Sequence, residues 1–302
     1  GSVETLEMYP LDFEEFLIAN GFNDEVLAYM RKQFERRLAL NDALHGRVMD
    51  LFREYLLTGG LPDAVNSFLA DRNIVKVRRI QAEIHKYYKA DAARYDLENR
   101  LKIQKVFELI PSVFENKKKR IIVKDIEGKV GKQFSDYESE FEYLTHAGVA
   151  WDVKAVSNPK FPLIESTQKS LLKLYLNDVG ILTNILYRNN INPILNDERS
   201  VNLGAVYETV VAQELKAHGH NLFYYDNKQR GEVDFLIDDY NALSVMPIEV
   251  KSGRDFKVHS AISQLTQNAD YHITYGVVLS NNGTVESKGS ILYLPVYYVM
   301  WF

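Results

Sequence analysis

The sequence predicts an α+β protein of several domains. Its 302 residues exceed what one hydrophobic core usually serves. Apolar residues recur at helical spacing through the first half, and residues 197–302 alternate like strands around helices. The 46% hydrophobic content, with only 16 Gly and 8 Pro, excludes a collagen-like or wholly disordered chain.

The pattern of residues 1–96 predicts that they form a helical region. The spacing of Phe13, Phe16 and Leu17 fits an amphipathic helix, with Asp12 or Asn20 as a plausible cap. A second helix over residues 51–56 ends at the Gly59-Gly60-Leu61-Pro62 segment. Residues 73–88 predict a further helix, whose exposed face carries basic side chains.

The pattern of residues 97–196 predicts that they form a winged-helix-like module. Helices are expected over 97–116, 121–130 and 135–146, the last opened by a capping box at Ser135–Glu138, followed by strands over 151–156 and 171–176. Asp136, Glu138, Glu140 and Glu142 crowd the candidate recognition helix with negative charge, which phosphates would repel. Either DNA meets the basic helices of residues 74–105, or the module packs against protein; we favour the second.

The pattern of residues 197–302 predicts an α/β domain with its elements in the order αβββαββ. The expected helices cover 204–218 and 257–270, and the expected strands cover 222–225, 232–237, 247–252, 275–280 and 291–299.

Charge is distributed unevenly along the chain. The net charge of −5 argues against bulk attraction to nucleic acid, but residues 72–120 alone carry +8 and residues 1–71 carry −7. The basic segment is therefore a candidate for phosphate contacts, through Lys76, Arg78, Arg79, Lys117, Lys118, Lys119 and Arg120.

Several classes of protein are excluded by what the sequence lacks. With no cysteine there is no disulfide framework, no thiolate zinc site and no cysteine nucleophile. No stretch approaches the roughly 18 apolar residues that span a bilayer, so we expect a soluble, cytoplasmic protein without a membrane partner. Gly1-Ser2 in place of an initiating Met suggests a piece of a longer parent.

Two carboxylates and a lysine are expected to converge in the C-terminal domain. A tight hairpin would bring Asp234 beside Glu249, and Glu249 and Lys251 lie two apart on a strand and share a face. Oxygen ligands of this kind suit Mg²⁺ or Mn²⁺, held by Asp234 and Glu249. Lys251 could position a metal-bound water or stabilise charge on a phosphate under attack.

Glu208, near the edge of the buried stripe of its helix, is the expected fourth member of this site. The order of Glu208 on a helix, Asp234 on a strand and Glu249-Val250-Lys251 on the next resembles the PD-(D/E)XK nuclease-like superfamily, whose core is αβββαβ. The resemblance implies an active-site role for Gln264 on the following helix. Val233 stands where the name of the superfamily has proline.

A second resemblance covers nearly the whole chain. It is to the prokaryotic AAA-type ATPases with a DUF4143 C-terminal region, and rests on Tyr9–Phe16, Thr58–Pro62, Leu174–Ile181, Glu232–Phe235 and Glu249–Gly253. It implies that residues 1–96 hold the end of an ATPase core and a helical lid-like region. No Gly-x-x-x-x-Gly-Lys-Ser/Thr motif is present, so ATP would bind only in the parent protein.

The leading expectation is therefore action on nucleic acid, as Mg²⁺-dependent phosphodiester cleavage or as DNA engagement coupled to the parent ATPase. The alternative is a non-catalytic module that binds a protein partner or regulates the ATPase. The sequence does not determine the oligomeric state.

Overall fold

The computed structural model describes residues 7–95, 99–113, 119–128, 131–196, 198, 202–253 and 260–302. Its first three helices each begin at a side-chain cap. Asp12, Asn23 and Asn41 each accept the backbone N–H of the third residue after them. These caps begin α1 (Phe13–Ala19), α2 (Asp24–Glu35) and α3 (Asp42–Thr58). Both candidate caps are found on α1, with Asp12 as its N-cap and Asn20 as its C-cap.

A glycine turn separates α3 from the next two helices. Gly59 ends α3 with a φ of 70°, a backbone conformation that favours glycine. A Cβ added to Gly60 would lie 2.0 Å from the carbonyl oxygen of Leu11, so only glycine fits this close approach. α4 (Pro62–Asp71) begins at Pro62, and α5 (Ile74–Tyr95) follows.

The middle of the chain contains the predicted three helices and hairpin. The elements are α6 (Arg100–Val113), α7 (Val123–Glu127), η1 (Phe134–Tyr137), α8 (Glu138–His146), β1 (Ala150–Val156), η2 (Leu163–Ser166), β2 (Thr167–Leu176), α9 (Val179–Tyr187) and α10 (Asn192–Leu195). The capping box is not at Ser135: Gln133 and Asp136 form it. The Asp136 carboxylate accepts the backbone N–H of Gln133 at 2.8 Å, and η1 begins one residue earlier than the predicted helix.

The last third of the chain is mixed α and β in the expected order. Its elements are α11 (Gly204–Ala217), β3 (Phe223–Asn227), β4 (Gly231–Asp239), β5 (Ser244–Lys251), α12 (Ser260–Gln267), η3 (Ala269–Tyr271), β6 (Gly276–Ser280), β7 (Glu286–Lys288), β8 (Ile291–Pro295) and η4 (Val296–Trp301). Two details differ from expectation. β7 was not predicted, and residues 296–299 are 3-10 helix rather than strand. Every residue from Val296 to Met300 is buried, so the apolar pattern has no period to distinguish the two.

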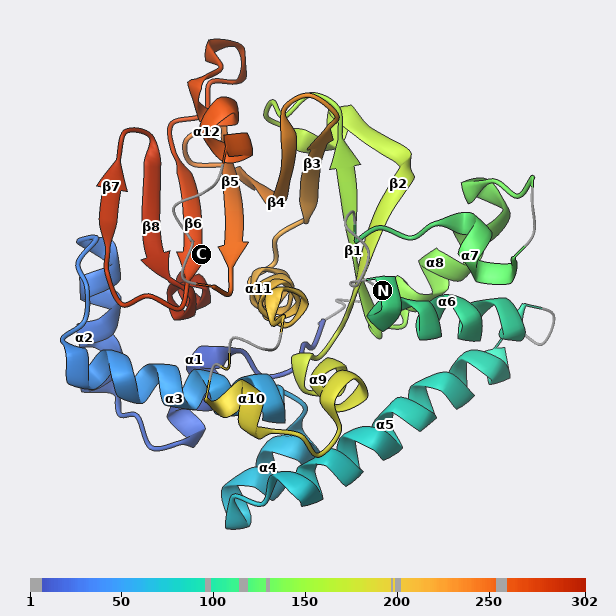
Figure 1. Ribbon diagram of the computed structural model, residues 1–302, viewed down its shortest axis with the longest axis horizontal. Coiled ribbons are helices and arrows are strands. Elements are labelled where there is room, and N and C mark those ends of the chain that lie inside the picture. The colour runs from blue at the N-terminus through green and yellow to red at the C-terminus, as the bar shows by residue number, and fades with distance from the viewer. Residues whose placement is uncertain are drawn as a thin grey trace, which may run out of the picture.

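One eight-stranded sheet joins the middle and the last third of the chain. Its strand order is β2-β1-β3-β4-β5-β6-β8-β7, and β1 pairs in parallel with β3 (Figure 1). The hairpin expected as a wing therefore extends the C-terminal sheet rather than standing apart from it. What the structure shows is a mixed helical and stranded fold, and the winged-helix assignment is not confirmed.

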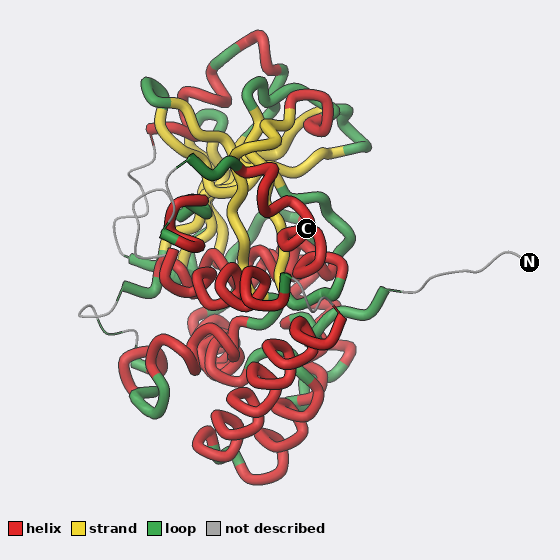
Figure 2. Tube along the Cα trace, turned by 90° about the vertical axis from the view of Figure 1, so that its right-hand side faces the viewer, coloured by secondary structure: helices red, strands yellow, loops and turns green. Residues whose placement is uncertain are grey.

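Helices cover the two faces of the sheet unequally. The larger apolar core contains residues of α1, α3, α9 and α11 together with one face of the strands, whereas α12 covers a smaller core on the other face. Most helices accordingly gather on one side of the strands (Figure 2). Among the described residues, no helix combines the length and apolar character needed to cross a membrane.

Buried polar groups tie the N-terminal helices to α11 and α9. The Glu214 carboxylate of α11 accepts the backbone N–H of Phe13 at 3.0 Å and the Tyr55 hydroxyl at 3.1 Å. Burial and the nearby Asp12 raise the pKa of Glu214 to about 8. At the N-terminus of α9, the Asp178 carboxylate accepts the N–H of Gly60 at 2.7 Å.

Candidate functional site

A β-bulge in β4 determines the position of Asp234. Tyr225 of β3 pairs with Val233, and Phe223 pairs with Leu236, so β4 has one residue more than β3 between these pairs. Val233 and Leu236 both belong to the core beneath α12. The extra residue lies in the stretch that contains Asp234, and bulges commonly redirect a side chain next to a functional site.

The Asp234 side chain forms a hydrogen bond with β5 just past the last pair of residues that β4 and β5 share in the sheet. The registered pairs run from Asp239 with Ser244 to Phe235 with Ile248. Beyond them, the Asp234 side chain accepts the backbone N–H of Val250 at 2.8 Å. Asp234 is thereby held next to Glu249, as the sequence predicted.

Glu249 and Lys251 lie on the same stretch of β5 and are bonded to each other. The Lys251 Nζ donates to Glu249 Oε1 at 2.7 Å. Burial and the Asp234 carboxylate raise the pKa of Glu249 to about 8, although Lys251 acts in the opposite direction. Burial alone would lower the pKa of Lys251, but Glu249 and Asp234 outweigh it and raise that pKa. Glu249 Oε2 is buried and has no hydrogen-bond partner in the described part of the chain.

Glu208 of α11 is close enough to Asp234 and Glu249 for their charges to interact. Burial and the Asp234 carboxylate raise the pKa of Glu208, against the opposing effect of nearby lysines. Both of its oxygens are bonded: Oε2 accepts the Tyr175 hydroxyl at 3.1 Å, and Oε1 accepts the Lys119 ammonium. The structure thus brings together four of the predicted site residues, Glu208, Asp234, Glu249 and Lys251.

Sequence reasoning missed two members of this cluster on β2. Lys173 has a side chain with 0% exposure, is bonded to Glu232 and lies 4.5 Å from the centre of the Tyr224 ring. Tyr175 is fully buried against Glu208. A lysine inside the apolar run Leu171–Leu176 was the available signal, because a buried lysine is rare unless it is paired.

The remaining predicted residues lie elsewhere. Gln264 is on the exposed side of α12 and takes no part in the hydrogen bonds described above. Lys76 pairs with Asp71 on the surface, and Arg79 is exposed. Lys117 and Lys118 lie outside the described residues.

The prediction that Arg78 contacts phosphate is wrong. Its residue exposure is 3%, and its NH1 donates to the carbonyl oxygens of Leu57 and Gly180 and to the Thr183 hydroxyl. Arg78 faces α3 and α9 because it lies on the packed side of α5. The guanidinium is part of the helical core.

Lys119 and Arg120 contact carboxylates of the domain rather than solvent alone. Lys119 bonds Glu208, and Arg120 NH1 lies 3.2 Å from the Asp226 carboxylate. Their side chains are 25% and 27% exposed. Lys119 therefore belongs to the carboxylate cluster around Glu208, and Arg120 pairs with a carboxylate next to it.

The fit of a divalent cation rests on Asp234 and Glu249. Among the described residues no group of three or more His, Asp or Glu side chains is arranged to hold a metal ion. Each oxygen of Glu208 already accepts one hydrogen bond, from Lys119 or from Tyr175. The unpartnered Glu249 Oε2 leaves one open ligand position, which suits Mg²⁺, since that ion often takes one or two carboxylates and completes its shell with water.

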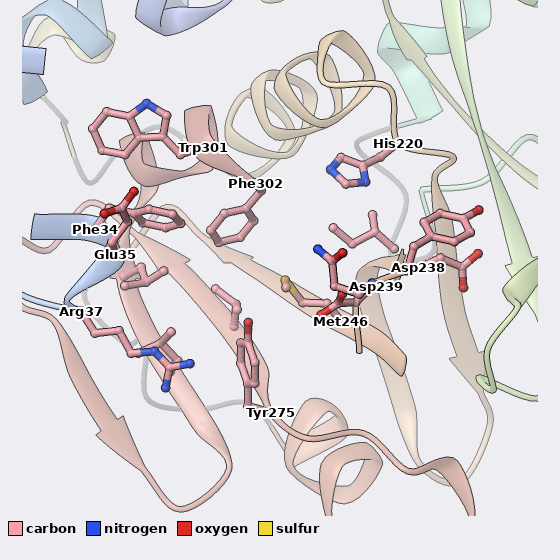
Figure 3. Close-up of a pocket in the computed structure, with 16 residues that line it drawn as sticks. Phe34, Glu35, Arg37, His220, Asp238, Asp239, Met246, Tyr275, Trp301 and Phe302 are labelled. Atoms are coloured by element: carbon pink, nitrogen blue, oxygen red, sulfur yellow. Dashed lines mark hydrogen bonds between the residues drawn. The ribbon is translucent and has the colours of Figure 1, made fainter. Parts of the chain in front are cut away.

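Two cavities lie away from this cluster. One, of about 450 Å³, has Phe34, Trp301 and Phe302 at one end and His220, Asp238 and Asp239 at the other (Figure 3). The other, of about 740 Å³, lies between α8 and the β1–β2 hairpin. Neither is lined by Glu208, Asp234, Glu249 or Lys251.

Two family models match parts of the chain. One is described as a domain of unknown function, DUF8612, and matches residues 49–192. The other is described as a domain of unknown function, DUF4143, and matches residues 203–299, which confirms the DUF4143 region of the expected resemblance. No curated protein and no solved structure matches the chain.

The two matched regions meet at the carboxylate cluster. Glu208, Asp234, Glu249 and Lys251 fall inside the DUF4143 match. Lys119 and Tyr175, which bond Glu208, and Lys173, which bonds Glu232, fall inside the DUF8612 match. The candidate site is thus composed of side chains from both regions.

Proposed function

We propose that residues 197–302 form a PD-(D/E)XK-like nuclease domain that cleaves phosphodiester bonds in nucleic acid with a divalent metal. The observation that supports this most strongly is the meeting of Asp234 with Glu249 and Lys251 where β4 stops pairing with β5. The order α11, β3, β4, β5, α12, β6 agrees with the αβββαβ core of that superfamily. The parent protein, on the same proposal, is a prokaryotic cytoplasmic ATPase of the AAA type.

Asp234 and Glu249 would hold the metal. Both are mostly buried, and a metal at the unpartnered Glu249 Oε2 would compensate a carboxylate that burial otherwise keeps protonated near neutral pH. When bound, Mg²⁺ or Mn²⁺ supplies charge stabilisation on the phosphate and a more acidic water. Lys251 is held by Glu249 and would place a positive charge at the phosphate under attack.

Nucleic acid would contact basic groups that remain partly or fully exposed. Lys76 and Arg79 are exposed on α5. Lys251 keeps 28% of its side chain exposed at the end of β5. Contacts of these groups to phosphates make binding fall steeply with salt.

Cleavage assays on matched variants test this function. Single- and double-stranded DNA and RNA are incubated with the chain and Mg²⁺ or Mn²⁺, alongside Asp234→Asn and Lys251→Met. The controls are Asp270→Asn and Lys288→Met, which change an exposed carboxylate and an exposed lysine of the same domain. Loss of cleavage in the first pair and retention in the controls supports the proposal. Equal cleavage in all five proteins, or none in any, contradicts it.

A non-catalytic protein-binding role is the second candidate, and the cavity beside α8 favours it. Glu138, Glu142 and Asp152 line this cavity together with Phe141 and Trp151, and so do Lys216 and Lys154, which pairs with Asp152. A groove whose α8 wall carries Glu138 and Glu142 beside apolar side chains suits a basic, partly apolar segment of a protein partner, such as a regulatory segment of the ATPase. The acidic α8 that argued against DNA in the sequence is thus placed at a groove.

Binding of a lysine- and leucine-containing peptide, followed by fluorescence anisotropy, tests that role. Reversing charge in Glu138→Lys/Glu142→Lys should abolish binding, whereas reversing an exposed carboxylate on α2, Glu25→Lys, should not. Equal affinity in the two variants would remove this candidate.

A further inference from the structure

Lys119 reaches the carboxylate cluster from the helical part of the chain. It precedes α7 and lies on a short segment, residues 119–121, that is bonded to the sheet. The Ile121 N–H donates to the Leu172 carbonyl of β2 at 3.0 Å, and Arg120 pairs with Asp226 of β3. These bonds hold the segment across the edge of the sheet next to Glu208.

The Lys119 ammonium is surrounded by negative groups. It donates to Glu208, whose side chain is only 3% exposed. Burial alone would lower the pKa of Lys119, but the carboxylates of Glu208, Asp234 and Glu232 outweigh it and raise that pKa. Lys119 is therefore a permanent cation of the cluster, and its charge also acts on Lys251.

A divalent cation at Asp234 and Glu249 would enter the field of this ammonium. Like charges in a poorly solvated site repel each other more strongly than they would in water. Glu208, the third carboxylate that interacts with Asp234 and Glu249, already accepts one hydrogen bond on each oxygen, from Lys119 and from Tyr175, so a metal at Glu208 would have to share these oxygens with them or displace them. Removal of the Lys119 ammonium would remove this repulsion and would leave Glu208 Oε1 without its lysine donor.

We propose that Lys119 is the resident counter-cation of this site and that a divalent metal competes with it for the carboxylates. Metal binding is then coupled to release of residues 119–121 from β2 and β3. This inference rests on the proposed function, because it assumes that Asp234 and Glu249 are metal ligands. Through Lys119, the region that matches DUF8612 controls whether the site in the region that matches DUF4143 can load metal.

Calorimetric titration with Mn²⁺ in the absence of nucleic acid tests the competition. Lys119→Met should bind Mn²⁺ at least about 10-fold more tightly than the unmodified chain, since it removes the competing charge. Lys119→Arg keeps the charge and should stay within about 2-fold of the unmodified chain. Lys288→Met, which changes an exposed lysine of β7, is the matched control and should also stay unchanged.

Hydrogen exchange on the unmodified chain gives a second measurement that needs no variant. The Ile121 amide is bonded to Leu172, so its protection should fall when saturating Mn²⁺ displaces Lys119 and the segment. Unchanged protection with metal bound, or equal Mn²⁺ affinity in Lys119→Met and the unmodified chain, overturns the competition alone. Absence of Mn²⁺ binding by every protein overturns both the competition and the metal site of the proposed function.

Discussion

The carboxylate of Asp234 accepts the backbone N–H of Val250, at 2.8 Å, where β4 and β5 have ceased to pair through their backbones. One side chain therefore satisfies a strand amide and presents its charge beside Glu249. Fold and proposed chemistry depend on the same group. Substitutions that keep one of these properties and remove the other can separate them.

Asp234→Asn should reduce the rate of metal-dependent cleavage at least about 100-fold, with little change in the free energy of unfolding. The amide oxygen can still accept the Val250 N–H, whereas the charge that would hold metal is lost. Asp234→Ala should also lose about 1–3 kcal/mol of unfolding free energy, because a buried N–H is left unbonded. Urea unfolding and the cleavage assay together check this, and equal stability of the two variants would contradict the structural part.

Glu214→Gln should remove part of the pH dependence of stability. The pKa of Glu214, about 8 in the folded chain, lies above that of an unfolded glutamate, so the folded state binds more protons between these values. Unfolding free energy from this group therefore falls as pH rises from about 4.5 to 8, by at most about 1.4 kcal/mol per pH unit.

Urea unfolding of Glu214→Gln at several pH values between 5 and 9 measures this contribution as a difference from the unmodified chain. The difference should grow in favour of the variant as pH rises, then level off above about 8. Glu25→Gln, an exposed carboxylate of α2, is the control. Parallel curves for Glu214→Gln and the unmodified chain would show that Glu214 is not protonated in the folded state.

Gly60→Ala should destabilise the chain by about 2 kcal/mol or more, since a Cβ there would overlap the Leu11 carbonyl. Gly46→Ala is the matched control: Gly46 lies inside α3, and a Cβ there meets nothing within 4 Å. That change should stabilise by up to about 1 kcal/mol. Thermal unfolding of the two variants should thus move in opposite directions, and a shared direction would refute the packing argument.

Arg78→Met and Arg79→Met should affect different properties although the residues are adjacent. Arg79 is exposed, so its loss should reduce the slope of log affinity against log salt for DNA by about 0.9 and leave stability unchanged. Arg78 donates inside the core, so its loss should lower stability by about 1–3 kcal/mol and leave the salt slope unchanged. A smaller salt slope in Arg78→Met would mean that the guanidinium reaches solvent.

Much of the fold and of the candidate site follows from local sequence. Asp12 marks the start of α1, and the spacing between Asp234 and Glu249 is that of two strands joined by a tight turn. Alternation along β5 places Glu249 and Lys251 on one side of the strand. Such patterns are visible because periodicity and caps depend on residues only a few positions apart.

Other features depend on contacts between distant parts of the chain. Nothing near Lys119 indicates that it bonds Glu208, and nothing near Arg78 distinguishes it from the exposed Arg79. The hairpin of β1 and β2 joins the C-terminal sheet through pairing with β3, which lies far along the sequence.

The sequence by itself determined the helical and stranded segments, the carboxylate pair Asp234 and Glu249, and the basic stretch of residues 72–120. Only the tertiary structure decided which of those basic groups are buried, which are exposed, and that Lys119 bonds Glu208. The physical reason is that a charged side chain takes its place from the partners that packing brings within a few ångströms. Those partners are set by long-range packing rather than by the neighbouring residues.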